Sequence, residues 1–310
     1  MEFHHVSVLL EECIAGLNIR PDGIYLDGTL GGAGHSSRIV SCLTTGRLIG
    51  VDRDETALAF ARERLAPYMD RVTLVHSNFK EVPGILEDLG IPGVDGMLFD
   101  LGVSSPQLDD ALRGFSYMAD APLDMRMDRS EGLSAYEIVN QWPREELRRI
   151  LFEYGEERYA PLIAAAIERR RGEKPIETTL QLVDVIRGAV PAKALREKQH
   201  PAKRTFQAIR IAVNDELGSV STLMEAAVDC LNPGGRLAVI TFHSLEDRIV
   251  KTAMNAAAKG CTCPPDFPVC VCGKKPRVRV ITRKPIEPSE AELNENPRSR
   301  SARLRICEKL

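Results

Sequence analysis

Acidic residues close several apolar runs in this chain, and their positions are the first chemical signal. Asp27 follows the run 24–26 and opens a glycine-rich turn that ends at Gly34, while Asp52 and Asp100 close later apolar runs. Glycines let the backbone approach a ligand closely, and an acid at the end of the next strand can accept both hydroxyls of a ribose. The spacing therefore indicates a binding site for an adenosine-containing cofactor.

The glycine pattern favours S-adenosylmethionine over a dinucleotide. A dinucleotide turn carries Gly-x-Gly-x-x-Gly, so that a pyrophosphate can bind at the helix N-terminus. Here the turn reads Asp27-Gly-Thr-Leu-Gly-Gly-Ala-Gly34, and its leading acid would repel a pyrophosphate but suits the ammonium group of an amino acid. S-adenosylmethionine has that ammonium, a sulfonium and a ribose diol, but no phosphate. With Asp27 near the methionine end and Asp52 on the ribose, a nicotinamide enzyme is the weakest rival, and glycines with a purely structural role are the plainer alternative.

The segment around Asp100 is the candidate for catalysis. It reads Phe99-Asp-Leu-Gly-Val-Ser-Ser-Pro-Gln107, so Asp100, Ser104, Ser105 and Pro106 share one strand end. Amino-group methyltransferases carry a polar residue, prolines and an aromatic ring at this topological position. The lone pair of an exocyclic amine such as cytosine N4 is delocalised into the ring, and groups that accept its protons localise the pair and aim it at a sulfonium methyl group. The aromatic residue of that pattern is missing here, and the candidates to replace it are Phe115, Tyr117 and Phe242.

A histidine and a serine stand together at His243-Ser244, with Glu246 and Asp247 close behind. Adjacent residues at a helix start do not face one another, so a hydrolytic triad is not expected here. We predict instead that Ser244 caps a helix.

Strands and helices alternate through residue 100, which predicts a parallel α/β sheet. Ligands bind outside the carboxyl ends of such strands, where the three acids and Asn78-Phe79 are expected to lie. Residues 107–206 read as helices without a good strand, and strands return after them. We therefore predict a Rossmann-like α/β domain with a parallel-rich sheet, made of residues 1–106 and 207–310, and an inserted all-helical domain for substrate recognition at 107–206. The predicted strands are 24–27, 48–51, 72–76, 94–100, 236–242 and, after the cysteine loop, the alternating basic segment 277–282.

Charge is unevenly distributed along the 310 residues, whose net charge is −3. Residues 168–210 and 274–310 each hold 11 Lys/Arg against 5 Asp/Glu. The chain therefore has two basic segments, the second of which is a tail, and the rest of the chain is acidic. Such a distribution is typical of contact with RNA or DNA, and solvated helix faces with a basic tail are the plainer alternative. We find no cleavable signal and no apolar run of membrane-spanning length, so we expect a cytoplasmic protein without a membrane partner. The oligomeric state stays open.

Four of the eight cysteines gather in the loop 261–272, whereas the others are scattered as reduced thiols of a cytosolic chain would be. Cys261, Cys263, Cys270 and Cys272 form two Cys-x-Cys pairs around a proline-rich spacer of six residues. Four thiolates can hold one tetrahedral zinc ion, and we consider such a zinc structural because no histidine or carboxylate stands beside it. The spacing is atypical of zinc sites. A rigid proline loop with reduced cysteines, or a pair able to form a disulfide, is the alternative.

Longer motifs are more specific than any of these single features. They are His4-His-Val-Ser-Val-Leu-Leu10, Asp27-Gly-Thr-Leu-Gly-Gly-Ala-Gly-His-Ser36, Asp52-Arg-Asp54, Asp100-Leu-Gly-Val-Ser-Ser-Pro-Gln107, Pro122-Leu-Asp-Met-Arg-Met127, Phe206-Gln-Ala-Ile-Arg-Ile-Ala-Val-Asn-Asp-Glu216 and Phe242-His-Ser-Leu-Glu-Asp-Arg248. Together they closely resemble the bacterial ribosomal RNA small-subunit methyltransferase H family, also called MraW, over nearly the whole chain. The resemblance implies a class I methyltransferase fold with a helical insertion. It also implies S-adenosylmethionine-dependent N4-methylation of one cytidine in the decoding region of 16S ribosomal RNA, within the small subunit or its precursor.

The resemblance also implies which residues contact the cofactor. Asp52 would hold the ribose, Phe79 would pack against the adenine, and Asp100 would serve the cofactor, the target amine or both. His35 is a candidate either for a cofactor contact or for a purely structural role. The implied contacts are Gly32, Ala33 (through its backbone), Gly34, Asp52, Phe79, Asp100 and Gln107.

Two other functions stay open at this point. One is methylation of DNA or of a different RNA amine. The other is nucleic-acid binding without catalysis, against which the intact Asp27, Asp52 and Asp100 argue.

Overall fold

The computed structural model describes residues 7–130, 132–261, 263, 267–269 and 272–310. Contacts divide the chain into two compact units. The α/β unit comprises residues 1–102 and 217–310, and the helical unit comprises residues 103–216.

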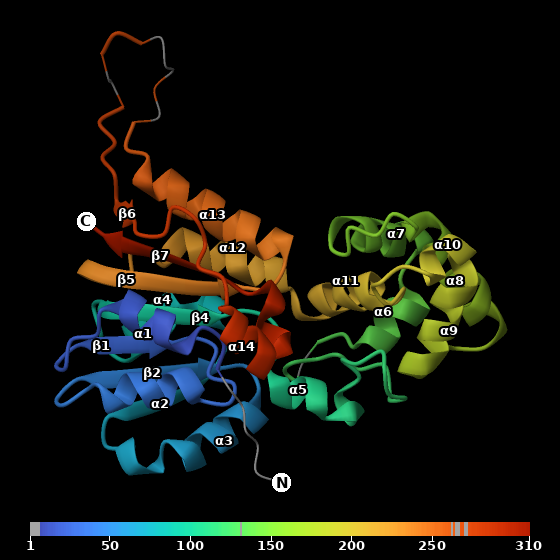
Figure 1. The fold of residues 1–310 in the computed structure, drawn as a ribbon, viewed down its shortest axis with the longest axis horizontal. Helices are drawn as coiled ribbons and strands as arrows, with labels where there is room; N and C mark the ends of the chain where they lie inside the picture. The colour runs from blue at the N-terminus through green and yellow to red at the C-terminus, as the bar shows by residue number, and fades with distance from the viewer. Residues whose placement is uncertain (1–6, 131, 262, 264–266, 270–271) are drawn as a thin grey trace. The chain divides into compact units, whose positions relative to one another are not determined.

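A seven-stranded sheet organises the α/β unit, in the order β3-β2-β1-β4-β5-β7-β6 (Figure 1). The first five strands run parallel to one another, and β7 is antiparallel to both of its neighbours. The strands are β1 (Ile24–Asp27), β2 (Arg47–Asp52), β3 (Val72–His76), β4 (Val94–Asp100), β5 (Leu231–Thr241), β6 (Val278–Val280) and β7 (Arg303–Lys309). This order confirms the predicted Rossmann-like α/β fold of class I methyltransferases with a parallel-rich sheet.

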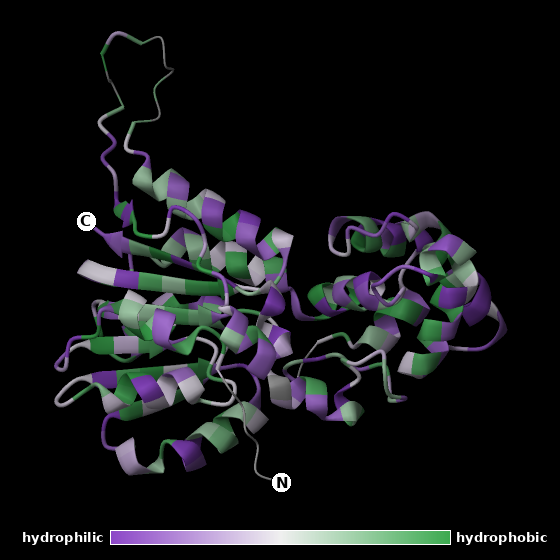
Figure 2. Cartoon of the chain, in the orientation of Figure 1, coloured by the Kyte–Doolittle hydropathy of each residue, from purple (hydrophilic) through white to green (hydrophobic). Residues whose placement is uncertain are grey.

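Helices cover both faces of this sheet, because neighbouring residues of each central strand point to opposite faces. Tyr25 and Leu98 face one core and Leu26 and Phe99 face the other. Figure 2 shows hydrophobic colour along the central strands of this sheet and on helices of both units. The helices of this unit are α1 (Leu10–Leu17), α2 (Gly34–Ser41), α3 (Glu55–Arg64), α4 (Val82–Asp88), α12 (Glu216–Ala226), α13 (Ser244–Ala258) and α14 (Glu290–Glu295).

The strand register brings the predicted acids to one edge. Asp27 ends β1 and pairs with Gly50 of β2, two positions before Asp52 ends that strand. On the other side Asp27 pairs with Leu98, two positions before Asp100 ends β4. The carboxyl ends of β1, β2 and β4 therefore place three carboxyl groups at the same edge of the sheet.

The end of the chain differs from the prediction of a basic tail. Its residues form β7, which lies between β5 and β6. Leu304 and Ile306 are buried in the core, and the Arg305 guanidinium makes two hydrogen bonds of 2.6 and 2.9 Å to the Asp247 carboxylate. Alternating apolar residues thus override the basic composition, because the arginine is paired inside the fold.

The helical unit surrounds its own apolar core. Its helices are α5 (Ser105–Asp109), α6 (Ala135–Gln141), α7 (Arg144–Glu153), α8 (Ala160–Glu173), α9 (Thr179–Ala189), α10 (Ala192–Leu195) and α11 (Lys203–Asn214). The sequence analysis assigned residues after 206 to the α/β domain, but α11 buries Phe206, Ala208 and Ile209 in the helical core. The division between the units consequently follows Glu216, because the apolar face of α11 packs against other helices.

Among the residues that the structure describes, we find no helix both long and apolar enough to span a membrane.

Replacement of Phe206 tests the place of α11. Phe206 is 3% exposed, so Phe206→Ala should lower the free energy of unfolding of the helical unit by about 3–5 kcal/mol through lost contacts and a residual cavity. Phe152 on α7 is 67% exposed, and Phe152→Ala should change it by less than about 0.5 kcal/mol. Hydrogen exchange should show the lost protection in α6 to α9. Equal costs for the two variants would contradict this packing.

Candidate functional site

The glycine turn after β1 holds an unusual backbone conformation. Gly31 and Ala33 both have positive φ angles, of 46° and 53°. Alanine rarely adopts this region, and such conformations gather at ligand sites. A Cβ at Gly28 would lie 2.1 Å from the Phe99 ring, so only glycine allows this close passage. The turn leads directly to α2, which begins at Gly34.

Hydrogen bonds to the first two acids brace this turn. The Asp27 carboxylate accepts from the Thr29 backbone N–H at 3.2 Å and from the Ser36 hydroxyl at 2.7 Å. The Asp52 carboxylate accepts from the N–H groups of Gly31 and Asp54, each at 2.8 Å. Asp27 is 1% exposed, so it stabilises the turn from inside and does not offer a ligand an open face.

Burial raises the pKa of both carboxyl groups to about 6, although these hydrogen bonds oppose the rise. The sequence did not single out Thr29 or Ser36. Their polar side chains in and just after a glycine turn were the signal that could have identified them as partners of Asp27.

Asp100 differs from the other two acids because one of its oxygens lacks a partner. Oδ1 is buried and has no hydrogen-bond partner among the described residues. The Asp100 backbone N–H donates to Thr29 Oγ1 at 2.5 Å, which ties the end of β4 to the glycine turn. Burial raises the pKa of Asp100 to about 8, and the charges of Asp27 and Glu246 add to the rise. The site thus holds a carboxyl group that a cationic ligand would ionise.

His35 does not supply that positive charge. Its Nδ1 lies 3.9 Å from Asp100 Oδ2, and its Nε2 lies 3.0 Å from the Val8 carbonyl oxygen. Burial lowers the pKa of His35 to about 4, so the imidazole is neutral at neutral pH. The pair is therefore not an ion pair, and His35 has a clear structural contact at the start of α2.

Phe79 follows β3 at the same edge, as predicted from Asn78-Phe79. Its ring meets the Phe99 ring edge to face, with the centroids 5.9 Å apart. The Asn78 side chain accepts from the Lys80 N–H at 3.1 Å and donates to Ser219 Oγ at 3.2 Å. These contacts fix an aromatic surface beside the turn.

The remaining predicted catalytic residues belong to the helical unit, at the start of α5. Ser104 Oγ accepts from the Gln107 N–H at 3.4 Å, and Gln107 Oε1 accepts from the Ser104 N–H at 3.0 Å. This capping box, with Pro106 in the first turn, gives Ser104 and Gln107 a local structural role. The side chain of Ser105 lies outside the described residues.

The three aromatic candidates occupy different environments. Phe115 is buried in the helical core, and Tyr117 stacks on His200 with the ring centroids 4.6 Å apart. Phe242 follows β5 in the α/β unit, where its Cδ2 lies 3.7 Å from the position of a Cβ at Gly102. Of the three, Phe242 is therefore the ring beside the segment that leaves Asp100.

The cluster after β5 caps a helix, but not through the predicted residue. His243, and not Ser244, is the N-cap of α13, and its side chain accepts from the Glu246 N–H. Glu246 Oε2 in turn accepts from the Phe242 N–H at 2.9 Å. Glu246 is 1% exposed and contributes negative charge near Asp100, a role that sequence reasoning missed.

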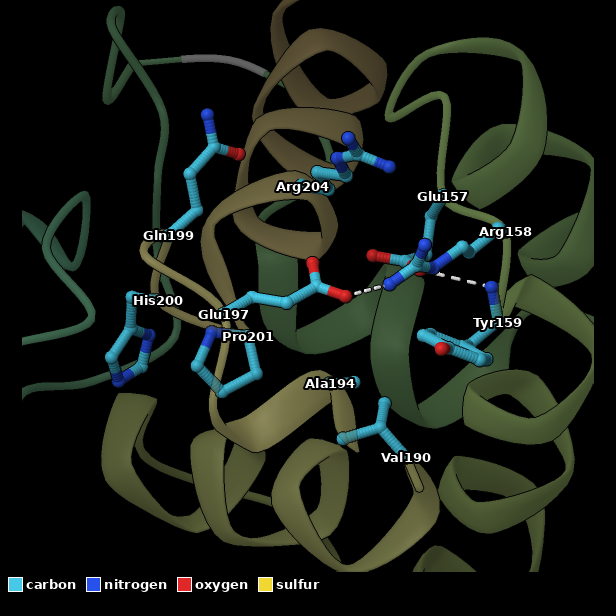
Figure 3. Close-up of a pocket in the computed structure, with 10 residues that line it drawn as sticks. All are labelled: Glu157, Arg158, Tyr159, Val190, Ala194, Glu197, Gln199, His200, Pro201 and Arg204. Atoms are coloured by element: carbon cyan, nitrogen blue, oxygen red, sulfur yellow. Dashed lines mark hydrogen bonds and ion pairs between the residues drawn. The ribbon is translucent and has the colours of Figure 1, made fainter. Parts of the chain in front are cut away.

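The helical unit has a polar pocket that the sequence did not predict (Figure 3). Arg158 lies over the Tyr159 ring, 4.8 Å from its centroid, and forms an ion pair with Glu197. The cavity measures about 30 Å³. This volume is more than the roughly 10–15 Å³ that one water molecule needs, but it is too small for a nucleoside. Because it is this small and its Arg158 is already paired with Glu197, we give it no part in cofactor binding.

The basic segments are used differently in the two units. In the α/β unit Arg279 pairs with Glu308 at 2.7 Å, and Arg305 pairs with Asp247 inside the fold. Exposed basic residues of the helical unit include Arg169, Arg187, Lys193, Lys198 and Lys203.

Three of the four predicted metal ligands are described, and they lie together. The Sγ atoms of Cys261, Cys263 and Cys272 are all within 4.8 Å of one another. Cys270 lies outside the described residues.

Comparison with known sequences gives a single family. A model of the MraW methylase family matches residues 2–310. A ribosomal RNA small subunit methyltransferase H from Brevibacillus brevis is 61% identical over 311 residues, which cover 100% of this chain and 99% of the relative. The protein of the same name from Heliobacterium mobile is 59% identical over 312 residues, and the match covers 100% of both chains.

Solved structures are more distant. A putative rRNA-methylase from Clostridium thermocellum has a TM-score of 0.47 and 11% identity, covering 99% of this chain and 100% of its own. A putative methyltransferase from Streptococcus mutans in complex with SAH has a TM-score of 0.43 and 13% identity, with the same coverage. Values this low carry no functional argument.

Asp100→Asn tests whether the pKa of the Asp100 carboxyl group is raised. A carboxyl group whose folded pKa is raised to about 8 stabilises the fold while protonated, and this contribution is lost as the pH rises from its unfolded pKa of about 3.9 to about 8. The melting temperature of the variant, relative to wild type, should therefore increase steadily between about pH 5 and pH 8. Asp22→Asn, at an exposed turn, should show no such trend. A constant difference for Asp100→Asn would contradict the raised pKa.

Proposed function

The chain belongs to the MraW methylase family, and from that premise we propose that it transfers a methyl group from S-adenosylmethionine to ribosomal RNA of the small subunit. We propose further that the acceptor is the N4 amine of one cytidine in the decoding region of 16S ribosomal RNA. The relatives from Brevibacillus brevis and Heliobacterium mobile are named ribosomal RNA small subunit methyltransferases, which supports the coarser statement. The resemblance of the motifs supports the finer one.

One observation carries the proposal: Asp100 Oδ1, at the carboxyl end of β4, is buried and has no hydrogen-bond partner within the described part of the chain. A buried acceptor without a donor is costly, and its usual explanation is a ligand that supplies the donor. An amine that approaches this edge can donate an N–H to that oxygen. A structural carboxylate would have been satisfied within the fold, as Asp27 and Asp52 are.

The residues of the turn fit S-adenosylmethionine. When bound, this cofactor supplies an electrophilic methyl group on a sulfonium sulfur. The backbone of Gly32, Ala33 and Gly34 would line it, with Ala33 contributing only main-chain atoms because its side chain is fully buried. Asp52 would accept the ribose hydroxyls, and Phe79 would pack against the adenine. His35 and Asp27 would act from behind the turn, since both are held by contacts within the fold.

Asp100 has the properties needed to position the target amine. Its free oxygen would accept an N4–H of cytosine, which localises the amine lone pair and orients it for attack. No strong base is required, because the proton can leave after the methyl group has been transferred. Ser104, Ser105 and Pro106 follow four to six residues later in the chain, and we propose that this segment completes the target site, with Gln107 as a cofactor contact.

The target base must be accessible for this chemistry. Side chains cannot reach cytosine N4 inside an A-form helix, so the cytidine is unpaired or extruded. We propose that the exposed basic residues of the helical unit hold the neighbouring phosphates. Because its substrate would be the small subunit or its precursor, we expect the protein to act in the cytoplasm.

Methyl transfer to small ribosomal subunits that lack their native modifications tests the reaction directly. With labelled S-adenosylmethionine, nucleoside mass analysis should detect N4-methylcytidine. Asp100→Ala should lower the turnover number by about 10²–10³-fold or more, as removal of one positioned electrostatic partner does. Asp22→Ala, at the exposed turn, should leave turnover unchanged.

Other outcomes of this assay have definite meanings. A different methylated nucleoside would replace the proposed target, and a methylated DNA would replace the substrate class. Cofactor binding without any transfer would move the search to another RNA or to DNA, whereas loss of both transfer and cofactor binding would favour a nucleic-acid-binding protein without catalysis. Near-normal turnover of Asp100→Ala would remove Asp100 from the mechanism.

Neutralising basic residues tests the role of the helical unit. We expect the triple change Arg169→Gln, Lys193→Gln and Lys203→Gln to weaken RNA binding and to flatten the slope of log K against log salt concentration by about 2, since each phosphate contact to a single strand contributes roughly 0.7. Cofactor binding, measured by calorimetry, should not change.

Arg62→Gln on α3 of the α/β unit is the matched control, since Arg62 is also exposed. If the control weakens RNA binding as much as the triple variant, or if the triple variant loses cofactor and RNA binding equally, the proposed division of labour fails.

A further inference from the structure

A cluster of thiols lies outside the candidate site, in the loop between α13 and β6 (Figure 1). Cys272 Sγ lies 3.8 Å from Cys261 Sγ, and the Cys263 N–H donates to Cys261 Sγ at 3.3 Å. All three sulfur atoms fall within 4.8 Å of one another. A disulfide requires about 2.05 Å between its sulfur atoms, so the 3.8 Å between Cys261 Sγ and Cys272 Sγ is too long for a disulfide between these two residues.

The sulfur separation suits one tetrahedral ion. Zinc–sulfur bonds are about 2.3 Å long, and a tetrahedron with such bonds has edges of about 3.8 Å. The distance from Cys261 Sγ to Cys272 Sγ equals that edge, and Cys263 Sγ lies within 4.8 Å of both. Thiolates are soft ligands, for which zinc in a tetrahedral sulfur site is the common partner.

The base of the loop is fixed by the fold, whereas its tip has little packing. The Arg277 N–H donates to the Ala257 carbonyl at 2.8 Å, and a Cβ at Gly260 would lie 2.6 Å from Pro276 Cδ, so the two sides of the loop touch there. Beyond this point Phe267 is 51% exposed and Val269 is 68% exposed. Apolar side chains this open do not hold a loop together, and small structures without a core use a metal or a disulfide instead.

We propose that Cys261, Cys263 and Cys272 bind a structural Zn²⁺ ion as three thiolate ligands. The ion joins the two sides of the loop beyond the contact between Gly260 and Pro276. It orders the exposed segment that carries Lys274 and Lys275 immediately after the last cysteine. This proposal is independent of the methyl transfer described above, because the cysteines take no part in that reaction.

Metal analysis of the purified full chain is the direct test. Wild type should hold one zinc ion per chain, and replacement of the zinc by Co²⁺ should give thiolate-to-metal charge-transfer absorption together with the strong visible bands of tetrahedral Co²⁺. Cys261→Ser and Cys272→Ser should each lose the metal and both absorption features. Cys42→Ser is the control, because Cys42 lies at the end of α2 and contacts Arg38 instead.

Limited trypsin digestion supplies a readout of the loop itself. Removal of zinc by a chelator should speed cleavage after Lys274 several-fold, and acid should release the metal because protons compete for the thiolates. Added Zn²⁺ should restore protection in wild type and in Cys42→Ser, but not in Cys261→Ser.

Several results would overturn the proposal. They are a metal-free wild type, bound iron in place of zinc, a disulfide between Cys261 and Cys272 in mass analysis, and full zinc content in both loop variants. Cleavage at the same rate before and after chelation would overturn the ordering role of the ion.

Discussion

Negative charge gathered at the carboxyl edge of the sheet is the constraint on which the site depends. The register of β1, β2 and β4 brings Asp27, Asp52 and Asp100 together where water has limited access. The fold satisfies the first two with hydrogen bonds from the glycine turn, and it leaves an oxygen of Asp100 without one. That unequal treatment distinguishes Asp100 from Asp27 and Asp52. It also makes the edge receptive to a ligand that carries positive charge and N–H groups.

The sequence predicted the sheet well, because the relevant signals are local. Apolar runs marked the strands 72–76 and 94–100 at their observed bounds, and the glycine turn marked the start of α2. The sequence predicted less well those features that depend on contacts between residues distant in the chain. The strand β7 alternates Leu304 and Ile306 with charged residues, and only its pairing with β5 and the partner of Arg305 distinguish it from a basic tail. The boundary after Glu216 likewise depends on which core receives Phe206.

The site shows the same division. Spacing alone located the acids and Phe79, but it could not show that both oxygens of Asp27 are engaged, since Ser36 reaches it only after one turn of α2. Nor could it reveal that Glu246 adds charge near Asp100. Asp100 ends β4 and Glu246 lies in the first turn of the helix after β5, and these two strands are distant in sequence but adjacent in the sheet. Residue types predict which chemistry is possible, whereas the partners of each atom decide which residue remains free to perform it.

The insertion of the helical unit has a consequence for how the protein is made. β4 and β5 are neighbours in the sheet, yet the whole helical unit separates them in the chain. During synthesis the strands β1 to β4 emerge first, and β4 keeps an open edge until the ribosome has delivered β5. Unpaired strand edges invite aggregation, and domains generally fold as units while the chain is being synthesised. Once the helices have folded, fewer flexible residues separate β4 from β5, which lowers the entropy cost of bringing the two strands together.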